Sequence, residues 1–235
     1  MSPYLAEFVG TLLLVLLGNG VVANVVLKNT KGEDGGWIVI SFGWGMAVFV
    51  AVFCVADISG AHINPAVTVG LALAGEFEVA LMAGYLAAQF AGAAAGAVLV
   101  WLVYRDHYSH TKDPDAKLAT FCTGPAIRNP VTNFLSEVIG TFVLVYAVLH
   151  ISSPEGGLGS LDSLPVGLVV LAIGLSLGGT TGYAINPARD FSPRLMHFLL
   201  PVDDKRDSDW EYAWVPFVGP LVGAAIASLI YVSLG

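Results

Sequence analysis

The amino-acid sequence predicts an all-α membrane protein with six transmembrane helices and two half-helices that meet at the midplane of the bilayer. Three observations predict this fold class: apolar runs of membrane length, two short apolar runs that each begin at an Asn-Pro pair, and a likeness between the two halves of the chain. The composition agrees, because 56% of the residues are hydrophobic and only 12% are charged, whereas soluble domains carry about 25% charged residues.

Six stretches are long and apolar enough to cross the hydrocarbon core, which takes about 20 helical residues. They cover residues 5–27, 37–56, 79–104, 132–153, 164–181 and 212–234. Two further apolar stretches, 64–74 and 186–197, are about half as long. Because an α-helix rises about 1.5 Å per residue, each of these two crosses only half of the bilayer.

Both short stretches begin with the same triplet, Asn64, Pro65 and Ala66 in one case and Asn186, Pro187 and Ala188 in the other. Proline is favoured at the first position of a helix, so each triplet marks a helix that starts inside the membrane. The residues before the triplets, "DISGAHI" and "GTTGYAI", are then not helical. Such backbone cannot face lipid and must be buried in protein or line a wet cavity.

The two halves of the chain, residues 1–104 and 132–235, resemble each other. "AEFVGTLLLVL" from residue 6 matches "SEVIGTFVLVY" from residue 136, and "QFAGAAAG" (89–96) matches "PFVGPLVG" (216–223). Each half holds three spanning helices, an odd number, so the halves enter the membrane from opposite sides and form an inverted repeat. We expect residues 105–131 to be a connecting loop. The pairs Gly92/Gly96 and Gly219/Gly223 are expected to let helix backbones approach closely.

These features resemble the aquaporin and glycerol-facilitator family (major intrinsic proteins) over nearly the whole chain. The resemblance is carried by "SGAHINPAVT", "GYAINPARD", and the glutamates at 7 and 137. It implies that residues 1–235 form a single membrane channel domain, that the protein is a homotetramer with one pore per subunit, and that both termini are cytoplasmic at the cell membrane. The distribution of Lys and Arg among the loops favours the opposite orientation.

Asn64 and Asn186 stand at helix N-caps, where a side-chain oxygen accepts a backbone N–H. We expect their amide NH₂ groups to donate into the pore. A water or hydroxyl oxygen that accepts both donors cannot also accept from its neighbours, which opposes proton relay. We also expect backbone carbonyls to form a ladder of acceptors along the pore. They belong to Gly60, Ala61, His62, Ile63, Gly182, Tyr183, Ala184 and Ile185.

Arg189 follows the second triplet, where the first copy has Val67. A charge at this depth is costly and usually functional, and the family resemblance places it at the narrowest constriction. The resemblance also assigns Trp44, Gly174 and Tyr183 to this selectivity filter. Glycerol-conducting relatives typically have Trp, Gly, Phe and Arg there, so the chain departs at Tyr183, whose hydroxyl either narrows the opening or adds a polar contact. We expect Gly174→His to abolish glycerol flux and to spare water.

Three carboxylates are expected to support the pore. Glu7 and Glu137 stand near the starts of corresponding helices and should accept hydrogen bonds from the bent stretches. Asp190 also marks the glycerol branch and could pair with Arg194 at helical spacing. Two interpretations of Asp190 remain: it widens the pore, as in the family, or it forms a surface ion pair.

The resulting functional prediction is a passive channel for small uncharged solutes, such as glycerol and dihydroxyacetone, and for water. The alternatives are a mainly water-selective channel and a channel that prefers small neutral carboxylic acids such as lactic acid. A transporter would need ion-coupling carboxylates beside the triplets, and an enzyme would need a nucleophile–base set or a metal cluster. We expect neither activity, and no cofactor or metal. The net charge of −8 argues against a nucleic-acid partner.

Overall fold

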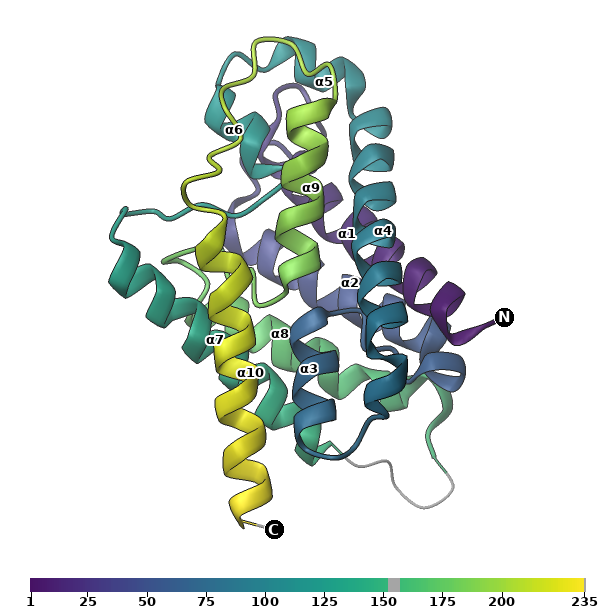
Figure 1. Cartoon of the computed structure of the whole chain (residues 1–235). Helices are drawn as coiled ribbons and strands as arrows, with labels where there is room; N and C mark the ends of the chain where they lie inside the picture. Colours follow the sequence, from purple (N-terminus) through teal and green to yellow (C-terminus); the bar gives the residue numbers. More distant parts are fainter. Residues whose placement is uncertain (152–156, 235) are drawn as a thin grey trace.

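The computed structural model describes residues 1–151 and 157–234, most of which are helical (Figure 1). The elements are α1 (Pro3–Val26), α2 (Gly36–Ser59), α3 (Pro65–Leu73), α4 (Val79–Val103), α5 (Arg105–His110), α6 (Pro114–Ala119), α7 (Pro130–His150), the 3₁₀ helix η1 (Gly159–Ser163), α8 (Leu164–Ser176), α9 (Pro187–Leu199) and α10 (Trp214–Leu234). Within these residues, six helical segments are long and apolar enough to cross a membrane: α1, α2, α4, α7, η1 continued by α8, and α10. The predicted fold class is confirmed.

The fifth span differs from the expected 164–181. Helix α8 ends at Ser176, and η1 supplies the missing length at its other end. The backbone N–H groups of Leu177 and Gly178 both donate to the carbonyl of Ile173, at 2.8 and 3.0 Å, and this shared acceptor ends the helical ladder. The other boundaries lie within three residues of the expectation, and residues 152–153 of the fourth expected span lie outside the described residues.

Residues 105–131 were expected to be a connecting loop, but they contain the two short helices α5 and α6. Helix α6 has a clear local cause. The side chain of Asp113 accepts the backbone N–H groups of Asp115 and Ala116, at 2.9 and 3.3 Å, and Pro114 occupies the first helical position. Both features stabilise a helix N-terminus, and they are readable in "DPDAK".

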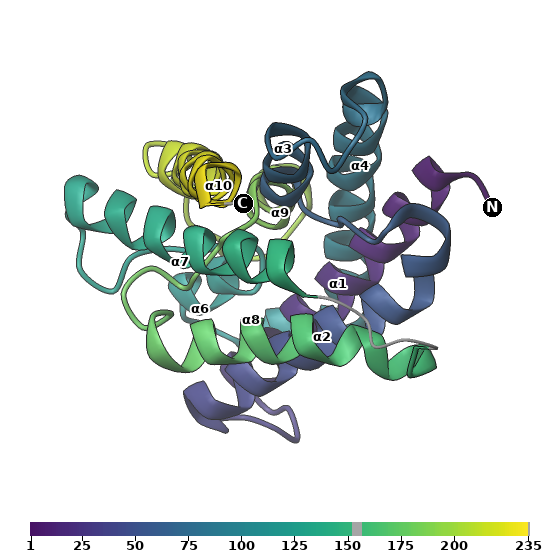
Figure 2. The same cartoon turned by 90° about the horizontal axis from the view of Figure 1, so that it is seen from below.

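The two halves of the chain build matching sets of contacts. Helix α1 packs on α4, α7 packs on α10, and α2 packs on α8 (Figure 2). The half-helices α3 and α9 lie one above the other and point in opposite directions from a common centre (Figure 1). Their alignment agrees with an inverted repeat, and it brings the two Asn-Pro-Ala triplets together.

Glycine allows the closest of these helix contacts. A Cβ at Gly92 of α4 would lie 2.3 Å from the carbonyl oxygen of Phe8 in α1. The corresponding Gly223 of α10 would place a Cβ 2.3 Å from the carbonyl oxygen of Val138 in α7. Because no side chain fits at such distances, the close packing expected at these glycines is confirmed.

Candidate functional site

Two non-helical stretches, which we call the first bend (residues 60–64) and the second bend (182–186), lead into α3 and α9. They share an unusual backbone. Ala61 and Ile63 have φ angles of 50° and 44°, and Tyr183 and Ile185 have φ angles of 37° and 42°. A left-handed conformation at a non-glycine residue costs about 1–3 kcal/mol, so the surrounding structure must hold both bends in place.

Glu7 holds the first bend. Its carboxylate accepts the backbone N–H groups of His62 at 2.9 Å and Ile63 at 2.6 Å. It also accepts the hydroxyl of Ser59 at 2.7 Å and the side-chain amide of Gln89 at 2.8 Å. Four donors converge on one side chain that is fully buried. These bonds satisfy both carboxylate oxygens, which would otherwise be buried without partners.

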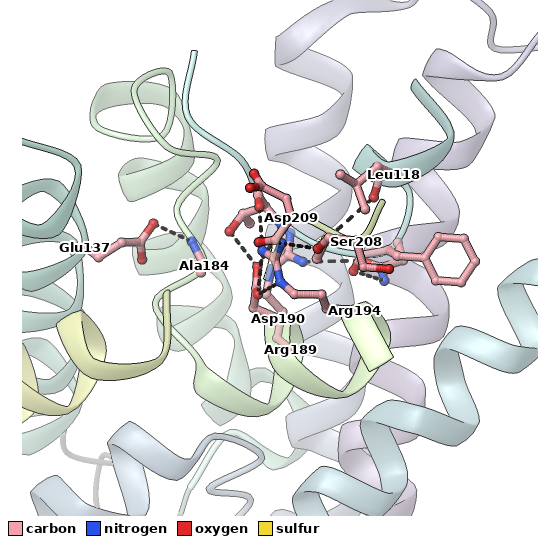
Figure 3. A network of polar contacts seen from close by, with 12 residues as sticks. Leu118, Glu137, Ala184, Arg189, Asp190, Arg194, Ser208 and Asp209 are labelled. Carbon is pink, nitrogen blue, oxygen red and sulfur yellow. Dashed lines mark hydrogen bonds and ion pairs between the residues drawn. The ribbon is translucent and has the colours of Figure 1, made fainter. Parts of the chain in front are cut away.

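Glu137 holds the second bend in the corresponding way. It accepts the backbone N–H groups of Ala184 at 3.0 Å and Ile185 at 2.9 Å, and the hydroxyl of Thr181 at 2.7 Å. The contact with Ala184 is visible in Figure 3. Each half of the protein therefore uses one buried glutamate to fix its strained bend.

Asn64 and Asn186 cap the two half-helices and also join them. The side-chain oxygen of Asn64 accepts the N–H of Ala66 at 2.9 Å, and its amide nitrogen donates to the carbonyl of Ile185 at 2.8 Å. The amide nitrogen of Asn186 donates to the carbonyl of Ile63 at 3.0 Å. Each asparagine therefore ties its own half-helix to the opposite bend.

These cross-ties correct two expectations. One N–H of each asparagine amide is already used, so at most one hydrogen of each amide remains to donate elsewhere. The carbonyls of Ile63 and Ile185 are likewise engaged, and each keeps only one further acceptor position. The two bends are thus locked to each other before any solute arrives.

A cavity of about 130 Å³ lies beside this junction. Its polar surface comes from the two bends, the two asparagines and Arg189. Its apolar surface comes from side chains of α1, α2, α3, α7 and α8, namely Leu14, Trp44, Val48, Val52, Val67, Leu71, Leu144, Val148, Val166 and Val170. Most of the expected pore and filter residues line the cavity, namely Trp44, Gly60, Ala61, His62, Ile63, Asn64, Tyr183, Ala184, Ile185, Asn186 and Arg189. The following expected residues are not among its lining residues: Gly174, Gly182, the prolines and alanines of the two triplets (Pro65, Ala66, Pro187 and Ala188) and the three carboxylates.

Arg189 lies over Trp44, with its guanidinium carbon 4.1 Å from the centre of the indole ring. Such stacking is a cation–π contact. One nitrogen of the guanidinium also donates to the side-chain oxygen of Asn19 at 3.4 Å. Within the described residues, Arg189 makes no ion pair, so its charge remains uncompensated at short range.

The sequence analysis missed Asn19, which is fully buried in α1. Its amide nitrogen donates to the carbonyl of Phe121 at 2.9 Å, and this bond turns its oxygen toward Arg189. The neighbouring Gly18 lies under the Trp44 ring, where a Cβ would come within 2.2 Å of the indole. The signal was present, because a polar Asn in the middle of an apolar span is costly unless it is hydrogen-bonded.

Tyr183 and Gly174 are in contact, which changes the interpretation of the glycine. A Cβ at Gly174 would lie 2.9 Å from Cζ and 3.0 Å from the hydroxyl of Tyr183. The space that glycine leaves is therefore occupied by tyrosine and does not widen the cavity. The hydroxyl is buried beside Gly174, which is not among the lining residues, so it adds no polar contact to the cavity; its effect on the width of the opening stays a prediction.

The expected pairing of Asp190 with Arg194 is confirmed, but the pair is buried and not at the surface, and Asp190 is not among the residues that line the cavity. It pairs with Arg194 at 2.9 Å, and both side chains are buried. Its other oxygen accepts the N–H and the hydroxyl of Thr123, both at 2.7 Å. Arg194 in turn donates to the carbonyl of Thr123. It also donates to the carbonyls of Ser208 and Asp209, which lie beside it in Figure 3. The pair fastens two connecting segments to α9.

Fold and site together define a multi-pass membrane protein in which two half-helices meet beside an amphipathic cavity. The family model for the major intrinsic proteins matches residues 1–231. The chain is 58% identical to a probable glycerol uptake facilitator protein of Thermotoga maritima, with 98% of each chain covered. It is 53% identical to a glycerol uptake facilitator protein of Streptococcus pneumoniae R6, again with 98% of each covered.

A solved structure has the same fold. The X-ray structure of the aquaglyceroporin from Plasmodium falciparum is similar with a TM-score of 0.86 and 34% identity, over 99% of this chain and 98% of that one. The chain belongs to the major intrinsic protein family.

Proposed function

We propose that the protein is a passive channel that conducts glycerol, similar small polyols and water across the cell membrane and excludes ions and protons. The observation that carries this proposal is the two-sided wall of the cavity. Carbonyls, amides and a guanidinium face an otherwise apolar lining. A polyol has the matching character, because its hydroxyl groups need hydrogen-bond partners and its CH groups do not.

The polar wall offers both kinds of partner. Arg189 and the remaining amide hydrogens of Asn64 and Asn186 are donors, and carbonyls of the two bends are acceptors. A hydroxyl that leaves water can therefore exchange its hydrogen bonds for equivalent ones, which lowers the cost of its dehydration. An apolar wall alone would impose that cost in full.

The exclusion of cations is attributed to Arg189 and to the junction where the two half-helices meet. The N-termini of α3 and α9 meet here, and each carries roughly half a positive charge from its aligned peptide dipoles. Together with Arg189 they oppose the entry of cations. Two fixed donors at Asn64 and Asn186 orient a passing water so that it does not accept from its neighbours. This orientation interrupts proton relay.

The relatives support the solute class, since two of them are named as glycerol uptake facilitators. On the same grounds we propose one channel domain over residues 1–235, a homotetramer in the lipid bilayer, cytoplasmic termini and no enzymatic activity. The halves 1–104 and 132–235 then line one pore together. The uncharged polyol remains the proposed solute in preference to water alone, because the cavity combines an apolar wall with many polar partners.

Stopped-flow light scattering on proteoliposomes tests the proposal by comparing water, glycerol, dihydroxyacetone and lactic acid. We expect glycerol flux well above that of empty liposomes, and no flux of K⁺. Leu144→Trp should block it, because Leu144 lines the cavity. Leu135→Trp is the matched control, since Leu135 lies on the same helix and is 49% exposed. Water flux without glycerol flux would favour the water-selective alternative.

A further inference from the structure

Tyr183 points its hydroxyl away from the cavity, into a pocket between α2 and α8. The ring lies against two glycines four residues apart, since a Cβ at Gly178 would come within 2.3 Å of its Cδ1 and a Cβ at Gly174 within 2.9 Å of its Cζ. Trp37 closes the pocket. Its ring meets that of Tyr183 edge-on at 5.8 Å, and its indole N–H donates to the carbonyl of Gly174 at 2.9 Å.

The floor of this pocket is Ser41, a fully buried residue of α2. A Cβ added at Gly174 would lie 3.0 Å from the hydroxyl oxygen of Tyr183 and 3.1 Å from Cβ of Ser41. The two side chains therefore flank one small space. Within the described residues, neither hydroxyl oxygen has a hydrogen-bond partner, although both are buried.

Two unpartnered hydroxyls at one buried site are an unusual combination. A buried polar atom without a partner loses its hydrogen bonds to water and gains nothing in exchange. Both groups are hydroxyls that rotate freely about a single bond, and each can donate or accept. Rotation of the Ser41 side chain is enough to bring its oxygen toward the tyrosine, and the resulting bond satisfies both atoms.

We infer that Ser41 is a positioning residue of the selectivity filter, because its hydroxyl is the hydrogen-bond partner that holds Tyr183 out of the pore. The inference rests on the proposed polyol channel and deepens it. Tyr183 and Trp44 both line the cavity, so a movement of the tyrosine ring changes the space between the walls. Without Ser41 the buried hydroxyl loses this partner, and the polar groups of the cavity wall become competing partners toward which the ring would tip.

A double-mutant cycle tests this role through the ratio of glycerol to water permeability in proteoliposomes. Ser41→Ala should lower the ratio about fivefold, the factor that corresponds to one lost hydrogen bond of ~1 kcal/mol. Tyr183→Phe sets the reference ratio of the cycle, because phenylalanine has no hydroxyl to satisfy. Adding Ser41→Ala to Tyr183→Phe should then change nothing further. Ser136→Ala is the matched control, a serine-to-alanine change in α7 whose hydroxyl bonds only to the carbonyl of Thr132.

Two results would overturn the inference: a wild-type ratio in Ser41→Ala, or an equal loss from Ser41→Ala in the Tyr183→Phe background. A second readout does not need glycerol flux. The Raman difference spectrum between wild type and Tyr183→Phe should show the Fermi doublet of a hydrogen-bonded tyrosine, and Ser41→Ala should shift it to that of an unbonded one. An unbonded doublet in the wild type would also overturn the inference. Absence of glycerol flux in the wild type would instead contradict the proposed function.

Discussion

The guanidinium carbon of Arg189 lies 4.1 Å from the centre of the Trp44 ring, so the only charged group on the cavity wall within the described residues rests on an aromatic face. Trp44 comes from α2 and Arg189 from α9, one from each half of the chain. The contact holds the flat guanidinium against the indole face, and both residues line the cavity. Its geometry depends on α1 as well, because Asn19 bonds to the arginine.

The first prediction concerns Asn19. Asn19→Leu removes the side-chain acceptor for Arg189 at nearly constant volume. We expect glycerol permeability to fall about fivefold, which corresponds to one hydrogen bond of ~1 kcal/mol. Asn19→Asp keeps an acceptor in place and should retain glycerol flux, but its negative charge should offset that of Arg189 and admit measurable K⁺. Proteoliposome flux assays read both effects.

Asn24→Leu provides the control for the Asn19 variants, because Asn24 lies on the same helix but is not among the cavity-lining residues. Its glycerol permeability should equal that of the wild type. Equal loss in Asn19→Leu and Asn24→Leu would show that any polar-to-apolar change in α1 disturbs the channel, and it would remove the specific role of Asn19.

The second prediction concerns Gly174. From the sequence alone, the expected loss of glycerol flux is that of Gly174→His, which introduces a large side chain. In the structure even Gly174→Ala conflicts with Tyr183, because the added Cβ would lie 2.9 Å from its ring. Since a buried contact of this kind costs about 1–3 kcal/mol, we expect the ring to move into the pore and glycerol permeability to fall by roughly tenfold or more. Stopped-flow measurements of glycerol and water check this result.

Gly179→Ala is the matched control, because a Cβ at Gly179 has no neighbour within 4 Å. It should leave both permeabilities unchanged. Removing the ring in Gly174→Ala/Tyr183→Gly should restore glycerol flux. Failure of that double variant to recover, together with full folding, would mean that the alanine acts directly on the pore.

The third prediction concerns the buried glutamates. Glu7→Gln replaces one acceptor oxygen by an NH₂ group that faces other donors. Hydrogen bonds to charged groups contribute about 1.5–3 kcal/mol each, so we expect the free energy of unfolding to fall by ~3 kcal/mol. A lower melting temperature of the detergent-solubilised protein would report this loss. Glu78→Gln, at an exposed position without a side-chain capping bond, should melt like the wild type.

The fourth prediction concerns the buried pair of Asp190 and Arg194. Arg194→Met leaves a carboxylate buried without its partner, and breaking such a pair costs about 3–5 kcal/mol of stability. The double variant Asp190→Asn/Arg194→Met removes both charges and should be more stable than Arg194→Met alone. Thermal melting of the three proteins distinguishes these cases. A double variant that melts below the single one would contradict this account of the pair.

Much of the architecture follows from the sequence because its causes are local. A run of apolar residues is long enough to span a bilayer or it is not, and an Asn-Pro pair favours a helix start wherever it occurs. The inverted arrangement follows from the odd number of spans in each half. Even the helix in "DPDAK" could have been predicted, since its capping residues adjoin it in the chain.

The roles of single residues in the candidate site depended on neighbours that are distant in the chain. Asn19 meets Phe121, which is 102 positions away, and Asp190 meets Thr123 at a separation of 67. Gly174 fits the family pattern of a wide filter, yet its space is filled by Tyr183. The sequence by itself determined the spans, the half-helices and their opposed directions. Only the tertiary structure decided which side chain occupies the space beside each glycine and which group orients Arg189, because packing and hydrogen bonding depend on distance in space and not on separation along the chain.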